Sequence, residues 1–270
     1  MRKPLGRSPF ESGTTNRFGR SRLGSGLTTT NSNARVSLPP ALSRQAAAPS
    51  APEAGNLGLN SERLRQAMVQ RLREQGIQNE TVLAAMGKVP RHLFVDEGLA
   101  SRAYEDAALP IGYGQTISQP WVVARMISAV CENGVPANVL EVGAGCGYQA
   151  AVLAHVVRQV HAIERVRGLY DMARQQLRDS GLGTRVRLVY GDGMLGLPTQ
   201  APFSAIVVAA AGLAIPQALL EQLALGGRLI APEGGSAQRL VLVERTGPSS
   251  WHRKELEAVR FVPLRAGTQS

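Results

Sequence analysis

Short apolar runs alternate with longer amphipathic stretches between residues 139 and 263 of the chain. Short runs are typical of buried strands, and apolar residues spaced by three or four positions are typical of helices. The pattern predicts strands over 139–142, 160–164, 186–190, 203–209, 228–231, 240–244 and 258–263, and helices over 149–157, 167–179 and 215–224. This order predicts an α/β fold with a doubly wound, mainly parallel sheet and helices on both faces. The last two strands leave little room for a helix between them, so an antiparallel edge strand is expected.

Extra N-terminal helices are predicted before this alternating region. A first helix is expected from Asn60 to Gly76, with apolar residues at every fourth position: Leu64, Met68 and Leu72. Asn79 is placed to cap a second, shorter helix that Gly87 ends. The segment that follows, residues 89–95, contains a proline and is expected to leave the helix and pack across the core.

The central motif of the chain is the segment 139–148, in which glycines occupy alternate positions after a buried strand. Gly143, Gly145 and Gly147 predict a tight turn, because glycine accepts positive φ and lets a ligand approach the backbone. The helix beyond the turn is expected to offer free N–H groups and the positive end of its dipole. In open α/β sheets ligands bind at the carboxyl ends of the strands, where this turn would lie.

The spacing of the glycines and of the nearby acids restricts the class of ligand that the turn can bind. The glycines follow a GxGxG pattern, and Tyr148 stands where a dinucleotide-binding fingerprint places its third glycine. Glu141, Glu164 and Asp192 lie at three successive strand ends, and Glu164 falls 17 residues after Gly147, near the expected place of a ribose-binding carboxylate. Acids in these positions suit an adenosine with a positively charged tail and repel a pyrophosphate. The plain alternative is a tight turn flanked by solvated acids.

A second polar segment, residues 109–120, lies between the N-terminal helices and the first strand of the alternating region. It carries a hydroxyl pair, Thr116 and Ser118, flanked by two glutamines. Pro120 opens a further predicted helix, since proline is favoured in a first helical turn. As an alternative to a functional role, Ser118 can cap that helix.

These two segments together resemble S-adenosylmethionine-dependent methyltransferases, and more closely the protein-L-isoaspartate O-methyltransferase family. Residues 139–149 resemble the family's cofactor motif, and residues 109–120 resemble its more specific substrate-side signature. Shorter agreements lie at 89–91, 94–96, 191–193 and 259–264, so the likeness spans roughly residues 60–266. The chain departs from the family at 209–212, where Ala-Ala-Ala-Gly replaces the usual Thr-Ala-Ala-Pro.

The resemblance implies a Rossmann-like methyltransferase fold and a reaction. The expected reaction transfers a methyl group from S-adenosyl-L-methionine to the free α-carboxylate of L-isoaspartyl residues in damaged proteins and peptides. The methyl ester can then close to a succinimide, which leads to repair. An α-carboxylate with a pKa near ~4 is already ionised at neutral pH, so no strong general base is required. Alignment of the reacting groups and exclusion of water are then the main tasks of the enzyme.

The resemblance also assigns roles to residues. Ser118 is expected to be the catalytic hydroxyl that orients the acceptor carboxylate, with Thr116 as a support. The expected cofactor-binding residues are Ile117, Glu141, Gly143, Ala144, Gly145, Glu164, Asp192 and Gly193. Glu164 is expected to bind the ribose hydroxyls, and Asp192 to face the adenine edge or, alternatively, to cap its own turn. Glu141 is expected to steady the glycine turn or the cofactor amine.

Other functions remain as alternatives. A methyltransferase acting on nucleic acid or on a small molecule is the nearest, although no Asn/Asp-Pro-Pro-aromatic motif of base methylases is present. A nicotinamide dehydrogenase would need the missing third glycine. A cofactor-binding relic with a partner-binding tail is disfavoured by the intact turn and by Ser118.

Charge and composition divide the chain into a basic N-terminal extension over 1–58 and a methyltransferase domain over 59–270. Residues 1–55 hold eight cationic and two acidic side chains, a net +6 of the chain's +10, so the core carries only +4. Few bulky apolar residues occur there, so the extension is expected to be disordered. A transit peptide and a contact with nucleic acid are the sharper alternatives for it. Nucleic-acid binding is not expected of the core, and no signal peptide or membrane span is expected.

The remaining candidate features indicate an ordinary intracellular enzyme. Cys131 and Cys146 are expected to stay as thiols in a reducing compartment, so a cytoplasmic location is predicted. The four histidines lack the spacing of a metal site, so no metal is expected. Isoaspartyl proteins and peptides are the expected partners, and the chain is expected to be a monomer.

Overall fold

A computed structural model gives the fold of the chain and describes residues 55–270, with side chains described from Ser61 onward. The predicted extension over 1–58 lies almost wholly outside the described residues, so its boundary stays a prediction. The described residues form one unit with its own core.

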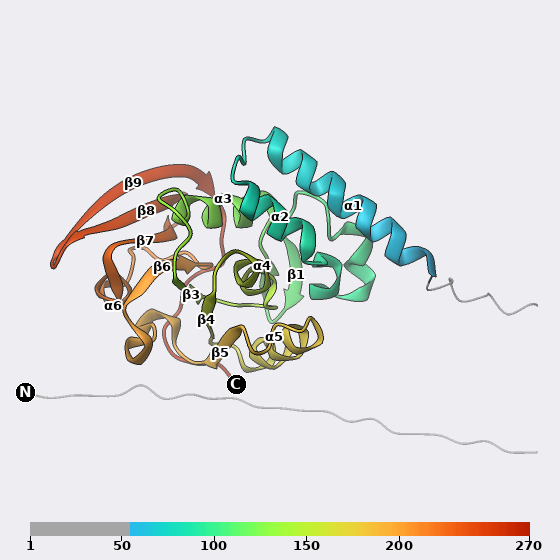
Figure 1. Cartoon of the computed structure of the whole chain (residues 1–270). Coiled ribbons are helices and arrows are strands. Elements are labelled where there is room, and N and C mark those ends of the chain that lie inside the picture. The colour runs from blue at the N-terminus through green and yellow to red at the C-terminus, as the bar shows by residue number, and fades with distance from the viewer. Residues whose placement is uncertain (1–54) are drawn as a thin grey trace, which may run out of the picture. The chain divides into compact units, whose positions relative to one another are not determined.

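Helices and strands alternate along most of this unit (Figure 1). The helices are α1 (Gly55–Glu74), α2 (Glu80–Lys88), α3 (Pro120–Val130), α4 (Tyr148–Val156), α5 (Arg167–Asp179) and α6 (Gln217–Glu221). Short 3₁₀ turns are η1 (Arg91–Phe94), η2 (Glu97–Arg102), η3 (Gly193–Leu195) and η4 (Pro198–Gln200). The strands are β1 (Leu109–Gly112), β2 (Gln115–Ile117), β3 (Asn138–Val142), β4 (Gln159–Glu164), β5 (Val186–Tyr190), β6 (Phe203–Val208), β7 (Leu223–Gly234), β8 (Gln238–Gly247) and β9 (Ser250–Val259).

The main sheet has the strand order β5-β4-β3-β6-β7-β8-β9. Strands β5, β4, β3, β6 and β7 run parallel to their neighbours, whereas β8 pairs antiparallel with both β7 and β9. The predicted mainly parallel sheet and its antiparallel edge are therefore confirmed. The chain order reverses between β3 and β6, which makes the carboxyl ends of these strands the expected place for a ligand.

Side chains of the parallel strands alternate between two apolar layers. Helices α1 to α5 and one face of the sheet share the larger core, which includes Val139 on β3 and Val160 on β4. The opposite face packs Leu140 and Ile163 against α6 and its preceding loop. Because successive side chains of a strand point to opposite faces, Glu141 lies on the same face of the sheet as Val139, and Glu164 on the same face as Val160. Both acids therefore lie near the ends of their strands, on the face that helices α1 to α5 cover.

The N-terminal helices follow the predicted pattern with one shift. Helix α1 begins at Gly55, ahead of the predicted start at Asn60. Met68 and Leu72 are buried, but Leu64 is 45% exposed and lies outside the apolar stripe. Helix α2 is capped as predicted, since the Asn79 side chain accepts a hydrogen bond from the Val82 N–H at 3.1 Å. It packs against α3 and α4.

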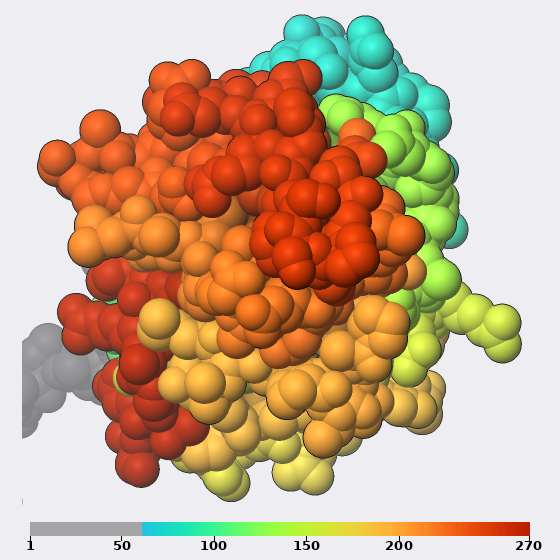
Figure 2. Space-filling view, turned by 90° about the vertical axis from the view of Figure 1, so that its left-hand side faces the viewer, coloured from blue at the N-terminus to red at the C-terminus, as the bar shows by residue number. Residues whose placement is uncertain are grey.

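The C-terminal third differs from the prediction in two places. The helix predicted over 215–224 is reduced to α6, and the two glycines at 226–227 lie inside β7, where the register with β6 shifts. The strand predicted over 258–263 is wrong, because the last strand is β9. Six of the ten β9 residues are exposed on the sheet edge and none is buried, so no apolar alternation identifies the strand. Figure 2 shows this side of the molecule, formed largely by the orange and red C-terminal segments.

Candidate active site

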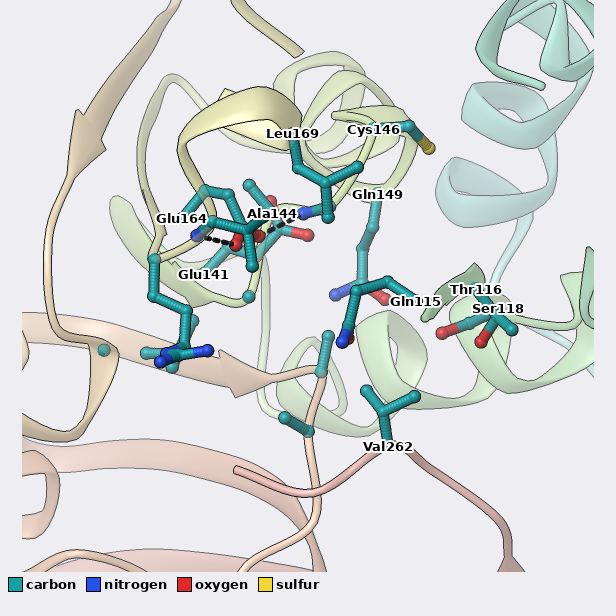
Figure 3. Close-up of a pocket in the computed structure, with 18 of the residues that line it drawn as sticks. Gln115, Thr116, Ser118, Glu141, Ala144, Cys146, Gln149, Glu164, Leu169 and Val262 are labelled. Carbon is teal, nitrogen blue, oxygen red and sulfur yellow. Dashed lines mark hydrogen bonds between the residues drawn. The ribbon is translucent and has the colours of Figure 1, made fainter. Parts of the chain in front are cut away.

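A pocket opens at the carboxyl ends of β3, β4 and β6, as the switch in strand order predicts (Figure 3). Together with the solvent at its mouth it encloses about 860 Å³. Most of its lining comes from the β1–β2 hairpin, the β3–α4 turn, the β4–α5 junction, the end of β6 and the segment after β9, and Val123 of α3 and Gly193 after β5 complete it. The predicted residues that line it are Ile117, Ser118, Glu141, Gly143, Ala144, Gly145, Glu164 and Gly193.

The glycine turn is shaped by its neighbours as well as by its own backbone. Gly143 and Gly145 have φ of +87° and +56°, conformations that disfavour residues with a side chain. A Cβ at Gly145 would lie 3.2 Å from Ile111 Cδ1 on the hairpin, and one at Gly147 would lie 3.2 Å from the Cβ of Ala173 on α5. The turn is therefore held between the β1–β2 hairpin and α5. Its first residues, Gly143 to Gly145, line the pocket.

Most N–H groups of the turn already have protein acceptors. Gly143 and Ala144 both donate to the Ile163 carbonyl, at 2.9 and 3.0 Å, and Gly147 donates to the Ala144 carbonyl at 2.8 Å. The Gly145 N–H donates to Glu164 Oε2 at 2.8 Å. These four donors belong to the turn, whereas α4 begins at Tyr148, so the expectation that the start of the helix offers free N–H groups stays a prediction. The turn is not built as a cradle for phosphate, which argues against a dinucleotide.

Glu164 ends β4 and joins the turn to α5. Its Oε2 accepts from Gly145 N–H, and its Oε1 accepts from Val166 N–H, each at 2.8 Å (Figure 3). Burial raises the pKa of the Glu164 carboxyl, and these two N–H groups oppose the shift. A carboxylate has about four acceptor sites. Glu164 can therefore hold the turn and still accept hydrogen bonds from a ligand in the pocket.

Glu141 is an unpaired buried carboxyl in the wall of the pocket. It has no solvent exposure, and neither of its oxygens has a hydrogen-bond partner among the described residues. Burial raises its pKa well above that of an ordinary glutamate; the neighbouring Gln149 amide opposes the shift, and the Glu164 carboxylate adds to it. The polar atoms of the Gln149 side chain are also buried and unpaired. An orphan carboxyl beside an orphan amide fits a cationic ligand that donates hydrogen bonds.

These observations fit S-adenosylmethionine better than the plain-turn alternative. The amino group and sulfonium of that molecule are positive, as the buried Glu141 carboxyl requires. Its ribose offers hydroxyl donors to Glu164. A solvated turn would not leave two polar side chains buried and unpaired in the wall of a cavity.

Asp192 lies beside the pocket, whose described lining includes Gly193 but not Asp192. Its Oδ1 accepts from the Met194 N–H at 2.9 Å, and its Oδ2 accepts from the Gly267 N–H at 2.6 Å. The structure therefore gives Asp192 the turn-capping role that was its alternative. Its contact with an adenine edge stays a prediction.

The segment after β9 forms a wall of the pocket that the sequence pattern did not reveal. Residues 262–265 line it, and residues 267–269 then cross the ends of β4 and β5. Gln269 N–H donates to the Arg165 carbonyl and its carbonyl accepts from Arg167 N–H, both at 2.8 Å. Extended segments held by isolated bridges carry no periodicity. Gln149 was also missed, although a glutamine in the otherwise apolar start of α4 is a signal.

Ser118 lies between β2 and α3 with its hydroxyl free. The residue that caps α3 is Gln119, which makes no side-chain cap bond, so the N-cap alternative for Ser118 is wrong. The Ser118 hydroxyl makes no hydrogen bond to any residue that the structure describes. Figure 3 shows Ser118 beside Thr116, across the pocket from the acidic side chains. Thr116 is exposed and lines the same pocket.

A second pocket adjoins the first at Ser118. The two share Thr116, Ser118, Ala209 and Val262 in their linings. With its open mouth the second pocket encloses about 1250 Å³, and its other walls are the start of α3 and residues 258–261. Arg260 is its charged side chain, and it forms no ion pair within the described residues. Residues 209–212, where the chain departs from the family pattern, begin at this junction with Ala209.

Metal sites, membrane-spanning helices and the state of the cysteines can be assessed only for the residues that the structure describes. Within residues 55–270 no group of three or more His, Cys, Asp and Glu residues is placed to hold a metal ion. None of the helices in this part is both long and apolar enough to cross a bilayer. Cys131 and Cys146 are buried free thiols, and burial raises the pKa of each to about 11.

Comparison with known proteins points in one direction. A family model described as protein-L-isoaspartate(D-aspartate) O-methyltransferase matches residues 62–269. A protein-L-isoaspartate O-methyltransferase of Bordetella parapertussis is 74% identical over 249 residues, which cover 92% of this chain and 96% of the relative. A relative of the same name from Bordetella avium is 67% identical over the whole of both chains. A solved structure of that name has a TM-score of 0.68 at 27% identity and covers 76% of this chain and 67% of its own.

The matched residues include both segments from which the site is built. The hairpin that carries Ser118 and the turn that carries Gly143 to Gly145 lie inside the range of the family model. The match covers well over half of the chain. The chain therefore belongs to the protein-L-isoaspartate(D-aspartate) O-methyltransferase family.

Proposed function

We propose that the two adjoining pockets serve the two halves of one reaction. The reaction is methyl transfer from S-adenosylmethionine to the free α-carboxylate of an L-isoaspartyl residue in a damaged protein or peptide. The observation that carries the proposal is the junction of the pockets at Ser118, whose free hydroxyl faces a cavity with an unpaired buried carboxyl in its wall.

The first pocket is the proposed donor site. Glu141, with Gln149 beside it, holds the positively charged methionine part, and Glu164 accepts hydrogen bonds from the ribose hydroxyls. Gly143, Ala144 and Gly145 bring the backbone close to the ligand, and Ile117 and Gly193 add apolar wall. When bound, S-adenosylmethionine supplies an electrophilic methyl group on a positively charged sulfur. The Asp192 side chain keeps the turn after β5 in place, and its remaining acceptor sites are proposed to face the adenine edge.

The second pocket is the proposed acceptor site. An α-carboxylate is ionised at neutral pH, because its pKa lies near ~4, so Ser118 has to orient it and not to deprotonate it. The Ser118 hydroxyl donates a hydrogen bond to one carboxylate oxygen, which leaves the other oxygen to react. Thr116 supports this arrangement from the neighbouring position of the hairpin. Unpaired Arg260 gives the pocket a positive charge that favours an anionic acceptor over a neutral one.

A matched pair of substrates tests the proposal. Wild-type protein is expected to transfer labelled methyl groups to an isoaspartyl peptide and not to the same peptide with an ordinary aspartyl residue. Ser118→Ala should lower kcat on the isoaspartyl peptide about 10- to 100-fold, the cost of one hydrogen bond to a charged group. The affinity of the variant for S-adenosylhomocysteine should stay at the wild-type value. Transfer to both peptides, or to nucleic acid in a control reaction, would favour the alternative of another substrate.

We further propose that the enzyme works as a monomer in the cytoplasm, with no role for nucleic acid in the core. The compartment is supported by two buried free thiols, which suit a reducing environment. Sedimentation of the full chain at micromolar concentration tests the first statement, and a dimer there would contradict it.

A further inference from the structure

The acceptor pocket has two walls that belong to distant parts of the chain. One wall contains Trp121 and Val122 from the first turn of α3, and the other contains residues 258–262, which follow the end of β9. A peptide in this pocket must fit between them, so their separation decides how it binds. The inference below rests on the proposed function, which makes this pocket the acceptor site.

A β-bulge near the end of β9 lies directly before one of these walls. Arg239 and Val241 of β8 pair with Ala258 and Glu255 of β9, so two residues of β9, Leu256 and Glu257, stand opposite one residue of β8. Such bulges bend a strand and redirect its side chains, and they are frequent beside active sites. Here the bulge lies directly before Ala258, where the strand enters the pocket wall.

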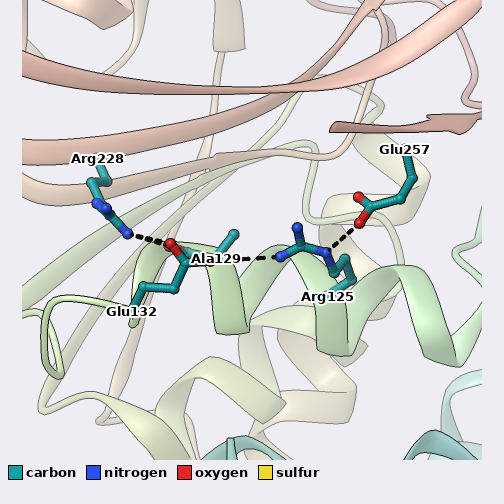
Figure 4. A network of polar contacts seen from close by, with 5 residues as sticks. All are labelled: Arg125, Ala129, Glu132, Arg228 and Glu257. Carbon is teal, nitrogen blue, oxygen red and sulfur yellow. Dashed lines mark hydrogen bonds and ion pairs between the residues drawn. The ribbon is translucent and has the colours of Figure 1, made fainter. Parts of the chain in front are cut away.

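The redirected side chain of Glu257 reaches helix α3. Its Oε1 accepts from Arg125 Nε at 2.9 Å, as Figure 4 shows. The Arg125 side chain is only 19% exposed. Glu257 Oε2 is buried and has no other partner, so Arg125 alone compensates the Glu257 charge within the described residues. Arg125 follows Trp121 by four positions and Val122 by three, which places it on their side of α3.

The far end of α3 has a second anchor. Arg228 of β7 donates through NH1 to the Ala129 carbonyl at 2.9 Å and to Glu132 Oε2 at 3.0 Å (Figure 4). Its Nε donates to Glu244 of β8 at 3.2 Å. Arg125 joins the same network through Glu132, since its NH1 lies 3.9 Å from Glu132 Oε1. The Arg125–Glu257 pair is the polar link that ties α3 to β9.

We propose that Arg125 and Glu257 are positioning residues that set the width of the acceptor pocket. Neither side chain lines the pocket, so both act through the wall residues next to them. The Glu257 side chain is 41% exposed, so its carboxylate turns toward water once Arg125 is lost and no longer ties β9 to α3. Residues 258–261, which line only the acceptor pocket, then move away from α3. The affinity for the isoaspartyl acceptor falls, whereas the donor pocket, which is bounded mainly by the β3–α4 turn and β4, keeps its affinity.

The test compares steady-state kinetics of full-length variants. Arg125→Gln should raise the KM for an isoaspartyl peptide about three- to tenfold, the size of coupling expected between contacting residues. The KM for S-adenosylmethionine and the kcat at saturating peptide should stay near wild type. Arg125→Lys keeps the charge and should restore most of the peptide affinity. Glu257→Gln keeps the shape of the side chain, and it should raise the same KM even if Arg125→Gln fails to fold.

A neighbouring ion pair supplies the matched control. Glu255 lies two residues before Glu257 on β9 and pairs with Arg239 at 3.3 Å, away from the pocket lining. Glu255→Gln should leave the KM for peptide unchanged. A lower melting temperature of Glu257→Gln with an unchanged KM for peptide would overturn the proposal, because it would give the pair a purely structural role. If wild-type protein methylates no isoaspartyl peptide at all, the proposed function itself fails, which is a different outcome.

Discussion

Glu164→Gln is the substitution that tests the architecture of the donor pocket most sharply. The carboxylate of Glu164 accepts from Gly145 N–H with one oxygen and from Val166 N–H with the other, each at 2.8 Å. Glutamine has the same shape but only one acceptor atom, and its NH₂ group must face one of these two N–H groups. A substitution that looks conservative therefore places two donors against each other in a largely buried site.

The magnitude follows from these contacts. One buried N–H loses its acceptor, which costs about 1–3 kcal/mol in the free energy of unfolding. In a domain of this size each kcal/mol shifts the melting temperature by roughly 2–4 °C, so a fall of about 2–12 °C is expected. The lost charge also weakens the bonds proposed to the ribose hydroxyls. We expect the Kd for S-adenosylhomocysteine to rise about 10-fold or more, since bonds to a charged acceptor contribute about 1.5–3 kcal/mol.

Thermal denaturation and titration calorimetry measure the two effects separately. Glu62→Gln, at an exposed position on α1, is the control for removal of one negative charge. It should change neither the melting temperature nor the Kd. If Glu164→Gln matches the wild type in both quantities, the two hydrogen bonds do not hold the turn and the ribose assignment is wrong.

Three further predictions concern the buried acid, the turn and the tail. The pKa of Glu141 is raised in the folded protein, so its contribution to stability is full below the unfolded pKa of about 4.3 and is lost as pH rises through the folded value. Glu141→Gln should therefore gain stability relative to wild type as the pH rises above about 4.3 in urea unfolding, and parallel curves for the two proteins would contradict this. Gly147→Ala should cost more stability than Gly181→Ala, because both glycines have positive φ but only Gly147 also packs against α5; equal losses would remove the packing argument. Removal of residues 1–54 should leave kcat and both KM values unchanged, and a loss of activity would show that the tail belongs to the enzyme.

Much of the fold could be predicted because the central parallel strands are buried on both faces. Runs such as 139–142 and 203–209 are mostly apolar, and the structure places β3 and β6 within one residue of these bounds. The edge strand β9 could not be found in this way, since most of its residues are exposed to solvent and none is buried. The helix before β7 was predicted too long, because its apolar residues also fit the strand that follows.

The site residues likewise fall into those that a local sequence pattern predicts and those that it does not. Residues on the glycine turn and at strand ends were found, because the geometry of an α/β sheet brings strand ends together whatever the details of side chains. The position of Ser118 beside them could be expected only from resemblance. Long-range contacts escaped prediction entirely: Gly267 on Asp192, and Arg125 with Glu257, join residues more than 70 positions apart. No local pattern carries that information.

A structure of the full chain with S-adenosylhomocysteine and an isoaspartyl peptide tests the central claim most directly. The account predicts the amino group of the ligand beside Glu141, its ribose hydroxyls on Glu164, and the peptide α-carboxylate on the Ser118 hydroxyl, facing the sulfur. A ligand bound elsewhere, or a peptide whose carboxylate lies away from Ser118, would contradict it.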